Sequence, residues 1–380
     1  RTVSEALAAQ TGGGSGMILH WYFARKFLWS TLLIFSIFVI LLALIDLVDK
    51  LQDFSALGFR EVLGIVLLKI PEDNYEILPL VIVLATVALY IRLARSSELI
   101  VVRAAGRSAL RSLAAPVAVA AVIGLLSVTM LNPIVAASAK RYNDLINTYV
   151  GGGVAAILVI ASEGLWLRQG NAQGQTVIHA ERASSDLTVL FDTTFMQFDP
   201  DGTPNQRIKA QAARLMGGEW VLYDVKAWDL ARGNISEATA VESDQMRIRS
   251  DLTQDRIVDS FGKPEYIPIW ELPEFIDQLE QAGFSARRYD MWYQMELARP
   301  LFLMSLVMVA AAFTMRPTRL SNTGISVLTA VLLGFGLHYI RNFAQILGEN
   351  GEIPITLAAW APPVASFMLA TGILLHMEDG

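Results

Sequence analysis

The chain has 380 residues, of which 53% are hydrophobic and 17% are charged, and its formal net charge is −6. An average soluble domain carries about 25% charged residues, so this composition predicts a protein that lies partly in a membrane. The acidic balance argues against a nucleic-acid-binding face. The absence of cysteine excludes disulfides, zinc–thiolate sites and cysteine nucleophiles.

The first 16 residues differ in character from the rest of the chain. They contain the run Gly12-Gly13-Gly14-Ser15-Gly16, which is typical of a flexible linker. We interpret residues 1–16 as a linker scar or the tail of a fused upstream chain, with Met17 as a plausible native start. The first apolar run begins near Phe27. It is too long for a signal-peptide core, so it is predicted to remain as a helix.

Six apolar stretches are long enough to cross a bilayer as helices, three on each side of a polar block. They are predicted at residues 27–48, 76–93, 109–131, 292–315, 325–346 and 355–376. The apolar segment 62–70 could extend the second span backwards, although Pro71 is expected to break or kink it. The third span is expected to stop at Asn132-Pro133. Transmembrane helices then occupy residues 17–133 and 289–380.

Lys and Arg gather in the short loops of one side, and this sets the predicted orientation. They precede the first span and separate the second from the third and the fourth from the fifth: Arg25, Lys26, Arg92, Arg95, Arg103, Arg107, Arg111, Arg316 and Arg319. The opposite loops carry mainly acids: Asp46, Asp49, Asp53, Glu349 and Glu352. The positive-inside rule therefore predicts cytoplasmic termini and an external polar block.

The polar block, residues 134–288, cannot lie in hydrocarbon because its backbone groups would go unsatisfied. Strand-like runs with turn signals between them occur at residues 156–160, 164–167, 176–180, 187–191, 194–198, 208–215, 219–223 and 225–230. Short strands at this spacing predict a β-sandwich or jelly roll. Its inner face is expected to hold Leu165, Val177, Leu187, Val189, Phe191, Phe195, Trp220 and Leu222. These residues would ordinarily form the core of a sandwich, but the sequence cannot distinguish a filled interior from an unfilled one.

The loop between the second and third spans, residues 96–108, carries helix start and stop signals. Ser96 is an N-cap candidate, Glu98 lies early and Gly106 closes the segment, with an apolar stripe that includes Leu99 and Val102. Glu98 near the start and Arg103 near the end complement the helix dipole. The segment fits either a solvated connecting helix or a docking helix for a cytoplasmic partner.

The same segment, SSELIVVRAAGRS, resembles the cytoplasmic coupling helix of the LptF/LptG permeases of the lipopolysaccharide export ABC transporter. Further similar segments cover nearly everything from Met17 onward: residues 47–51, 76–80, 149–153, 163–168, 209–214, 220–222 and 289–292. The Gly-Leu-Trp strand and the Val-Asp-x-Leu end of the first span are closer to the LptG branch than to the LptF branch.

The resemblance implies a half-transporter that pairs with an LptF-like paralogous permease around a cavity. An LptB-like ATPase dimer would drive it through five residues of the coupling helix, Glu98, Leu99, Val102, Arg103 and Arg107. The β-domain, a jelly roll in the family, would pass lipopolysaccharide to an LptC-like bitopic protein and a periplasmic bridge. Its path would be lined by Val177, Leu187, Val189, Phe191 and Trp220. The implied location is the inner membrane of a Gram-negative bacterium.

No catalytic or cofactor site is predicted. The chain lacks the phosphate-binding pattern G-x-x-x-x-G-K-[ST], so ATP and Mg are expected to be used by the partner ATPase and no cofactor by this chain. The histidines show no metal-ligand spacing, and no serine lies in a nucleophile elbow. We therefore expect a transport subunit that is not itself an enzyme.

Charged residues in or beside the spans are the candidates for a substrate gate or cavity: Asp46, Asp49, Lys50, His338 and Arg341. The first three lie at the outer end of the first span, either at the water boundary or along a lateral gate for lipid A. Some relatives carry lysine where this chain has Asp46, Gln52 and Asp53. The acids would then pair with basic residues of a partner helix or face a less phosphorylated head group.

His338 and Arg341 lie one turn apart on one face of the fifth span. They could line the cavity, form a structural ion pair or reach toward the outer interface.

The leading hypothesis is a permease subunit that extracts lipopolysaccharide from the inner membrane. The alternatives are the LptF-type paralogue of the same complex and a non-transporting membrane scaffold or sensor with a ligand-binding β-domain.

Overall fold

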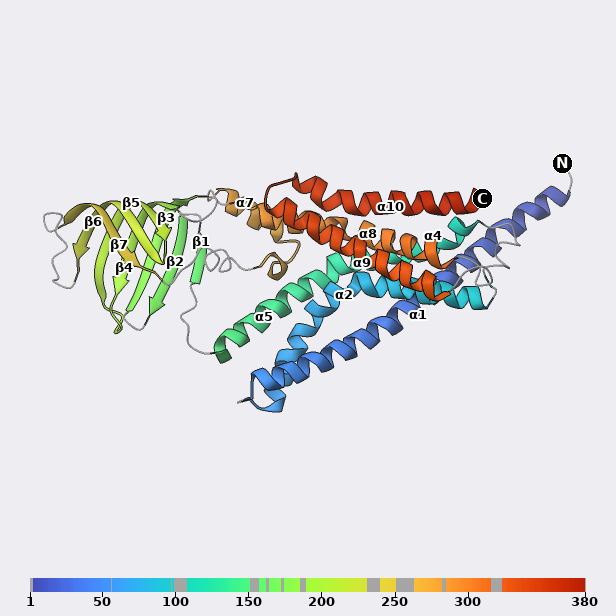
Figure 1. Cartoon of the computed structure of the whole chain (residues 1–380), viewed down its shortest axis with the longest axis horizontal. Coiled ribbons are helices and arrows are strands. Elements are labelled where there is room, and N and C mark those ends of the chain that lie inside the picture. Colours follow the sequence, from blue (N-terminus) through green and yellow to red (C-terminus); the bar gives the residue numbers. More distant parts are fainter. Residues whose placement is uncertain are drawn as a thin grey trace. The chain divides into compact units, whose positions relative to one another are not determined.

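The computed structural model describes residues 3–55, 57–96, 98, 108–150, 157–161, 164–171, 174–184, 189–230, 240–250, 263–281, 285–315 and 323–379. The chain forms two compact units, one made of Arg1–Tyr142 with Met291–Gly380 and the other of Asn143–Asp290. Figure 1 shows that the first unit is helical and that the second contains the strands.

Within the described residues, six helical segments are long and apolar enough to cross a membrane, as the sequence predicts. Their helices are α1 (Val3–Asp53), α2 (Phe59–Arg95), α4 (Ala109–Leu126) continued by η1 (Ser127–Leu131) and α5 (Asn132–Val150), α8 (Arg287–Thr314), α9 (Thr323–Glu349) and α10 (Ile355–Asp379). The predicted membrane protein with a strand domain between its third and fourth spans is thus confirmed.

Three helices run further than the sequence predicts. α1 includes Gly12 to Gly16, where we expected a flexible linker, because extending an existing helix costs less than nucleating a new one. Pro71 does not end α2, which is continuous from residue 59 and confirms the backward extension. A proline inside a membrane helix is tolerated where neighbouring groups satisfy the freed backbone.

The expected stop at Asn132 and Pro133 is also absent, because a π-helical turn joins α4 to α5. In this turn the backbone N–H of Asn132 donates to the carbonyl of Ser127, five residues earlier. Pro133 therefore falls in the first turn of α5, where a helix can do without a backbone donor. The third span consequently continues well beyond the predicted boundary.

The core of the helical unit surrounds α2 and α8. Of the most apolar stretch of each span, 72% is buried in α8 and 61% in α2, against 11% in α1 and 17% in α9. α1 and α9 therefore present rows of exposed apolar side chains, including Trp29, Leu33, Ile37, Ile40, Leu44, Leu328, Leu332, Ile340, Phe343 and Ile346. Such faces suit contact with lipid or with another membrane helix.

The second unit contains one seven-stranded antiparallel sheet in which consecutive strands are neighbours. The strands are β1 (Ile157–Ala161), β2 (Gly164–Asn171), β3 (Gly174–Ala183), β4 (Val189–Phe198), β5 (Pro204–Met216), β6 (Glu219–Asp229) and β7 (Val241–Arg249). η3 (Pro264–Tyr266) and α7 (Leu272–Gln281) come after the sheet. The order of the described strands is that of a meander, and β7 falls where the sequence predicted no strand.

The sheet curls until its two ends approach each other. The hydroxyl of Ser250, next to β7, donates to the side-chain oxygen of Gln169 in β2 at 2.7 Å. Inside the curl, Trp220 is fully buried and its ring meets Phe195 edge-on, with 6.1 Å between centroids. The domain predicted as a β-sandwich or jelly roll thus encloses its core with one curled antiparallel sheet.

A line of bends crosses the sheet at two aspartates. Asp192 in β4 and Asp224 in β6 both have a left-handed φ of 52°. On either side of the bend in β4, Leu190 and Thr193 are both buried although they are three residues apart. In a regular strand residues three apart lie on opposite faces, so the inward-facing set changes at the bend. The sequence predicted two short strands in place of β4 and two in place of β6, because aspartate is depleted in strands.

The predicted inner face was correct for Leu165, Phe195, Trp220 and Leu222, which are fully or almost fully buried. It was wrong for Phe191, which is 37% exposed. Val177 and Val189 are half-buried, whereas their neighbours Ile178 and Leu190 are fully buried. The bend at Asp192 explains the error at Val189 and Phe191, since strict alternation was carried across it. Val177 was assigned to the wrong face of β3, where its neighbour Ile178 lies opposite the buried Phe195. Leu187 lies outside the described residues.

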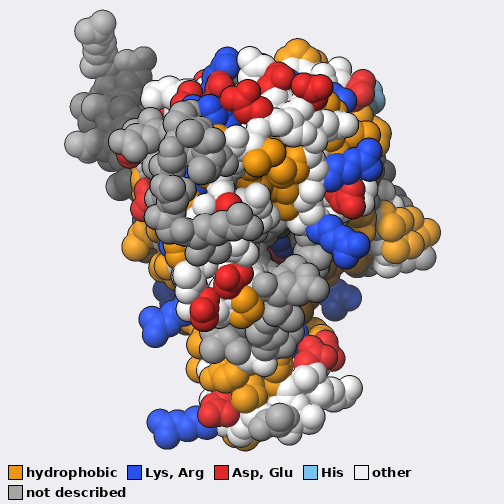
Figure 2. Space-filling view, turned by 90° about the vertical axis from the view of Figure 1, so that its left-hand side faces the viewer, with side chains coloured by type: hydrophobic (Ala, Val, Ile, Leu, Met, Phe, Trp, Pro, Cys, Tyr) orange, Lys and Arg blue, Asp and Glu red, His pale blue; other side chains and the backbone are white. Residues whose placement is uncertain are grey.

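The face of the molecule drawn in Figure 2 mixes acidic, basic and apolar side chains. On this face, within the described residues, no continuous basic stripe is visible.

Gly124 of α4 packs directly on Pro300 of α8, and this close approach can be tested. A Cβ at Gly124 would lie 2.5 Å from the Cα of Pro300, which neither backbone can easily accommodate. We expect Gly124→Ala to lower the free energy of unfolding by about 1–3 kcal/mol through overpacking. The measurement is thermal unfolding of the purified protein in detergent.

Gly372→Ala in α10 is the matched control, because a Cβ there meets no atom within 4 Å. Alanine favours a helix over glycine by about 1 kcal/mol, so this variant should be unchanged or slightly more stable. Equal unfolding temperatures for the two variants would contradict the close packing of α4 on α8.

Candidate functional site

The first candidate site surrounds Glu98, a described residue of the predicted coupling helix. Its carboxylate accepts hydrogen bonds from the Lys26 ammonium at 2.9 Å to each oxygen and from the Tyr22 hydroxyl at 2.9 Å. The Ser96 hydroxyl adds another at 2.9 Å. The Lys26 ammonium also lies 4.3 Å from the centre of the Tyr22 ring. Two side chains of α1 therefore hold an acid that belongs to the loop after α2.

This environment keeps Glu98 ionised. Partial burial by itself would raise the pKa of the Glu98 carboxyl, but the hydrogen bonds from Lys26, Ser96 and Tyr22 outweigh it and lower the pKa. A lowered pKa means that the stabilisation is present above the ordinary carboxyl pKa and is lost as the pH falls through the lowered value. The contact is thus fully formed at neutral pH.

The remaining residues of the predicted coupling set are not placed. Leu99, Val102, Arg103 and Arg107 lie outside the described residues. Their assignment as contacts for an ATPase therefore stays a prediction. Sequence reasoning identified Glu98 but missed Lys26 and Tyr22 as its partners, because 72 and 76 residues separate them from it along the chain.

The second candidate site lies at the other end of α1. Asp46, almost fully buried, accepts a hydrogen bond from the Lys69 ammonium of α2 at 3.0 Å, and Lys69 also lies 3.6 Å from Asp73. Lys50 pairs instead with Asp53, one turn further along α1, at 2.9 Å. Asp49 is exposed. Asp46 thus pairs with a basic residue of a neighbouring helix within this chain.

Lys69 is a member of this cluster that the sequence analysis missed. It lies in the apolar segment 62–70, which was considered only as an extension of the second span. A lone lysine within an apolar run is itself a signal, since such a charge needs a partner or an aqueous exit.

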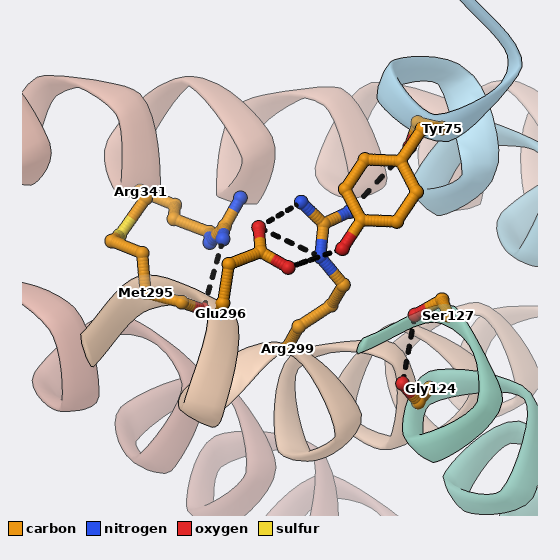
Figure 3. Close-up of polar contacts among 7 residues, drawn as sticks. All are labelled: Tyr75, Gly124, Ser127, Met295, Glu296, Arg299 and Arg341. Atoms are coloured by element: carbon orange, nitrogen blue, oxygen red, sulfur yellow. Dashed lines mark hydrogen bonds and ion pairs between the residues drawn. The ribbon is translucent and has the colours of Figure 1, made fainter. Parts of the chain in front are cut away.

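The third candidate site is a polar network at the centre of the helical unit, drawn in Figure 3. Glu296 and Arg299 of α8 form an ion pair with 2.5 Å between Nη2 and Oε1, and their side chains are 0% and 5% exposed. The Tyr75 hydroxyl of α2 donates to the Glu296 carboxylate. The Arg299 guanidinium stacks on the Tyr75 ring at 3.9 Å from its centre. The network ties α2 to α8.

Arg341 of α9 reaches the same centre, as Figure 3 shows. It is 5% exposed, donates to the backbone carbonyl of Met295 at 3.3 Å and lies 5.0 Å from the centre of the Phe302 ring. Its Nε has no hydrogen-bond partner among the described groups. Arg341 is therefore buried in the helical unit, and its role in a substrate cavity stays a prediction.

His338 does not join Arg341 in this network. Its Nε2 lies 3.2 Å from the side-chain nitrogen of Asn342. The ring lines a cavity of about 150 Å³ between α2 and α9, together with Glu76, Leu80, Val83, Gly334 and Phe335. The two residues predicted to act together therefore lie in different places. His338 lines a small cavity, and Arg341 lies in the packed interior.

The network residues Tyr75, Glu296 and Arg299 were also missed from the sequence. Glu296 and Arg299 stand three residues apart inside an apolar span, and this spacing places them together on one helix face. Charges at such positions normally face a bundle interior. The signal was present, but their third partner, Tyr75, lies 221 residues away from Glu296 along the chain.

Among the predicted β-domain path residues, Trp220 lies in the packed interior while Val177, Val189 and Phe191 are at least partly accessible. Phe191 also lies beneath Arg182, with 5.7 Å between the guanidinium carbon and the ring centre. The structure thus places these residues on more than one face of the sheet. Their role in a lipid path stays a prediction.

Comparison with known proteins gives one consistent result. A family model described as lipopolysaccharide export system permease LptF/LptG matches residues 21–376. The permease protein LptG of Escherichia coli strain K12 is 24% identical over 365 residues, which cover 94% of this chain and 98% of that protein. LptG of Haemophilus influenzae is 22% identical over 317 residues, which cover 82% of this chain and 85% of that protein.

The buried ion pair makes a prediction about stability. Glu296→Gln removes the counter-charge of Arg299 while keeping the size of the side chain, and it leaves a buried guanidinium unpaired. Breaking a buried pair from one side costs about 3–5 kcal/mol. We expect a loss of this size in the free energy of unfolding, measured by denaturant titration in detergent micelles.

Two further variants test the cause of this loss. Asp53→Asn removes the exposed pair with Lys50 and should cost less than about 1 kcal/mol. The double variant Glu296→Leu with Arg299→Met removes both charges and should recover most of the stability. A wild-type free energy of unfolding in Glu296→Gln would overturn the assignment.

Proposed function

The chain belongs to the LptF/LptG family of lipopolysaccharide export permeases, and from this premise we propose that it takes lipopolysaccharide from the membrane into a cavity shared with a second permease. The observation that carries the proposal is the match over residues 21–376, which takes in all six spans and the inserted sheet. It is a multi-pass inner-membrane permease subunit. A non-transporting scaffold has no comparable support.

The energy for transport would come from another chain. The sequence has no phosphate-binding loop, so an LptB-like ATPase dimer is proposed to bind and hydrolyse ATP with Mg. The segment 96–108 would dock on this ATPase. Glu98, near the start of this segment, accepts hydrogen bonds from Tyr22 and Lys26 of α1. These bonds support the proposal because they connect the docking segment to a membrane helix.

The proposed orientation puts this segment and both termini in the cytoplasm and the β-domain in the periplasm. It rests on the arginines of the loops, of which Arg25, Arg92, Arg95 and Arg111 are all exposed. The acidic cluster of Asp46, Lys69 and Asp73 then falls near the outer leaflet. Lipopolysaccharide would enter beside this cluster, with Asp49 and Lys50 at the mouth of the gate.

The second permease would be an LptF-like paralogue. The comparisons favour the LptG branch for this chain, since the similar proteins carry that name. The exposed apolar faces of α1 and α9 support such pairing, because they offer surface for another membrane helix. From the shared cavity, lipid would pass to the β-domain, an LptC-like protein and a periplasmic bridge.

The docking proposal is tested by Glu98→Lys. Reversing this charge should lower the lipopolysaccharide released per ATP by about tenfold, because the segment loses its charge-assisted hydrogen bonds to α1. The measurement is lipopolysaccharide release from vesicles that contain the complete complex, together with its ATPase rate. Normal transport stimulated by ATP in Glu98→Lys would contradict the proposal.

Glu352→Lys is the matched control for this experiment. It makes the same charge change at an exposed residue of the loop between α9 and α10, on the opposite predicted side of the membrane. Coupling in this variant should remain as in the wild type.

The lipid path is tested by photo-crosslinking in the β-domain. A photoreactive residue at Val177 or Phe191 should capture lipopolysaccharide only when ATP is supplied. The same residue at Ile178, next to Val177 and fully buried, reports the other face of β3. Equal capture without ATP, or capture at Ile178 alone, would show that Val177 and Phe191 are not on the transport path.

A further inference from the structure

The Glu98 carboxylate has most of its hydrogen-bonding capacity used within this chain. It accepts from three side chains, and two of them, Lys26 and Tyr22, stand one turn apart on α1. A single ion pair at a water boundary is weak, but several donors converging on one carboxylate fix its position more firmly. The arrangement is therefore a multidentate attachment between the loop and α1.

The attachment connects the loop to a long, continuous helix. α1 runs without a break from Tyr22 to Asp53. Lys26 and Asp46 are 20 residues apart, which corresponds to about 30 Å along a helix axis. At that far end Asp46 is paired with Lys69 of α2. The loop acid and the outer cluster are therefore connected to opposite ends of the first membrane span, Leu19–Asp53.

Two helices connect the clusters: α1 carries Lys26 and Asp46, and α2 carries Lys69 and Asp73 and ends at Arg95, near Glu98. α2 also leads away from the loop, but it belongs to the buried centre, where it is tied to α8 through Tyr75. The most apolar stretch of α1 has the smallest buried share of the six spans, 11% against 61% in α2. Because Lys26 and Tyr22 belong to α1, movement of Glu98 would act on α1 directly.

We propose that Lys26 and Tyr22 are positioning residues that clamp the coupling segment to α1, so that movement of the segment in the ATP cycle is transmitted along α1 to Asp46. The inference rests on the proposed coupling function and adds its route. It also gives Glu98 a partner within the chain, in addition to any contact with an ATPase. The clamp needs opposite charges at positions 26 and 98 and does not depend on which position carries which.

The experiment is a charge exchange in the full transporter complex. Lys26→Glu and Glu98→Lys are each expected to lower the lipopolysaccharide released per ATP by about tenfold, as loss of charge-assisted hydrogen bonds would. The double variant Lys26→Glu with Glu98→Lys restores opposite charges and should recover most of the wild-type ratio. Tyr22→Phe, which removes one hydroxyl and keeps the ring, should give an intermediate ratio.

Arg25→Ala is the matched control, since Arg25 is exposed and adjacent to Lys26. It should leave the ratio unchanged. Co-purification of the ATPase with every variant shows that the complex assembles, and the ratio per ATP separates coupling from general loss of activity.

The outcomes separate the two proposals. If Glu98→Lys lowers the ratio and the double variant does not recover it, Glu98 acts on the ATPase alone and the clamp is overturned. If Lys26→Glu alone keeps the wild-type ratio, the clamp is likewise overturned. If Glu98→Lys itself transports normally, the docking function of the segment fails first.

Discussion

The ion pair between Glu296 and Arg299 is the interaction on which the helical unit depends. Hydrocarbon offers no solvation for a charge, so each of these side chains requires the other in order to be buried at all. The Tyr75 hydroxyl of α2 donates a hydrogen bond to the Glu296 carboxylate, and the Tyr75 ring stacks on the Arg299 guanidinium. Helices that lie far apart in the chain are thereby fixed at one point, and α2 and α8 form the centre around which the other spans pack.

The same constraint explains why the charges proposed to act in transport lie elsewhere. Charges that act on a lipid head group or a partner need access to water, and the proposed ones are connected to the two ends of the first span. Glu98 is held by Lys26 and Tyr22 at one end, and Asp46 is held by Lys69 at the other. Between them α1 is apolar and mostly exposed. A continuous helix with a charged contact at each end of its membrane span can carry a displacement from one contact to the other.

The β-domain follows a different physical rule, because its backbone groups are satisfied between strands. Its enclosed interior comes from the curl of one sheet and from the bends at Asp192 and Asp224. A left-handed residue within a strand is costly for most side chains, and aspartate tolerates it better than most. The bends decide which side chains enter the interior, so Leu190 is enclosed while Phe191 remains partly exposed.

Much of the architecture could be predicted from the chain because lipid imposes rules that local sequence obeys. Apolar length gave six spans, strand-like runs gave the inserted domain, and the helix signals of residues 96–108 marked the segment that holds Glu98. Errors arose where a local signal was overruled by its neighbours. Pro133 was expected to end the third span, but the π turn at Ser127 accommodates it. Pro71 was expected to break or kink the second span, and it does not break α2.

Sequence by itself determined the membrane class, the number of spans, the place of the β-domain and the family resemblance, since each depends on residues close together in the chain. Only the tertiary structure decided which charges are partners. Lys26 meets Glu98, Lys69 meets Asp46, and Tyr75 meets Glu296 across gaps of 72, 23 and 221 residues. Contacts over such separations depend on how whole helices pack, and no local periodicity encodes that packing.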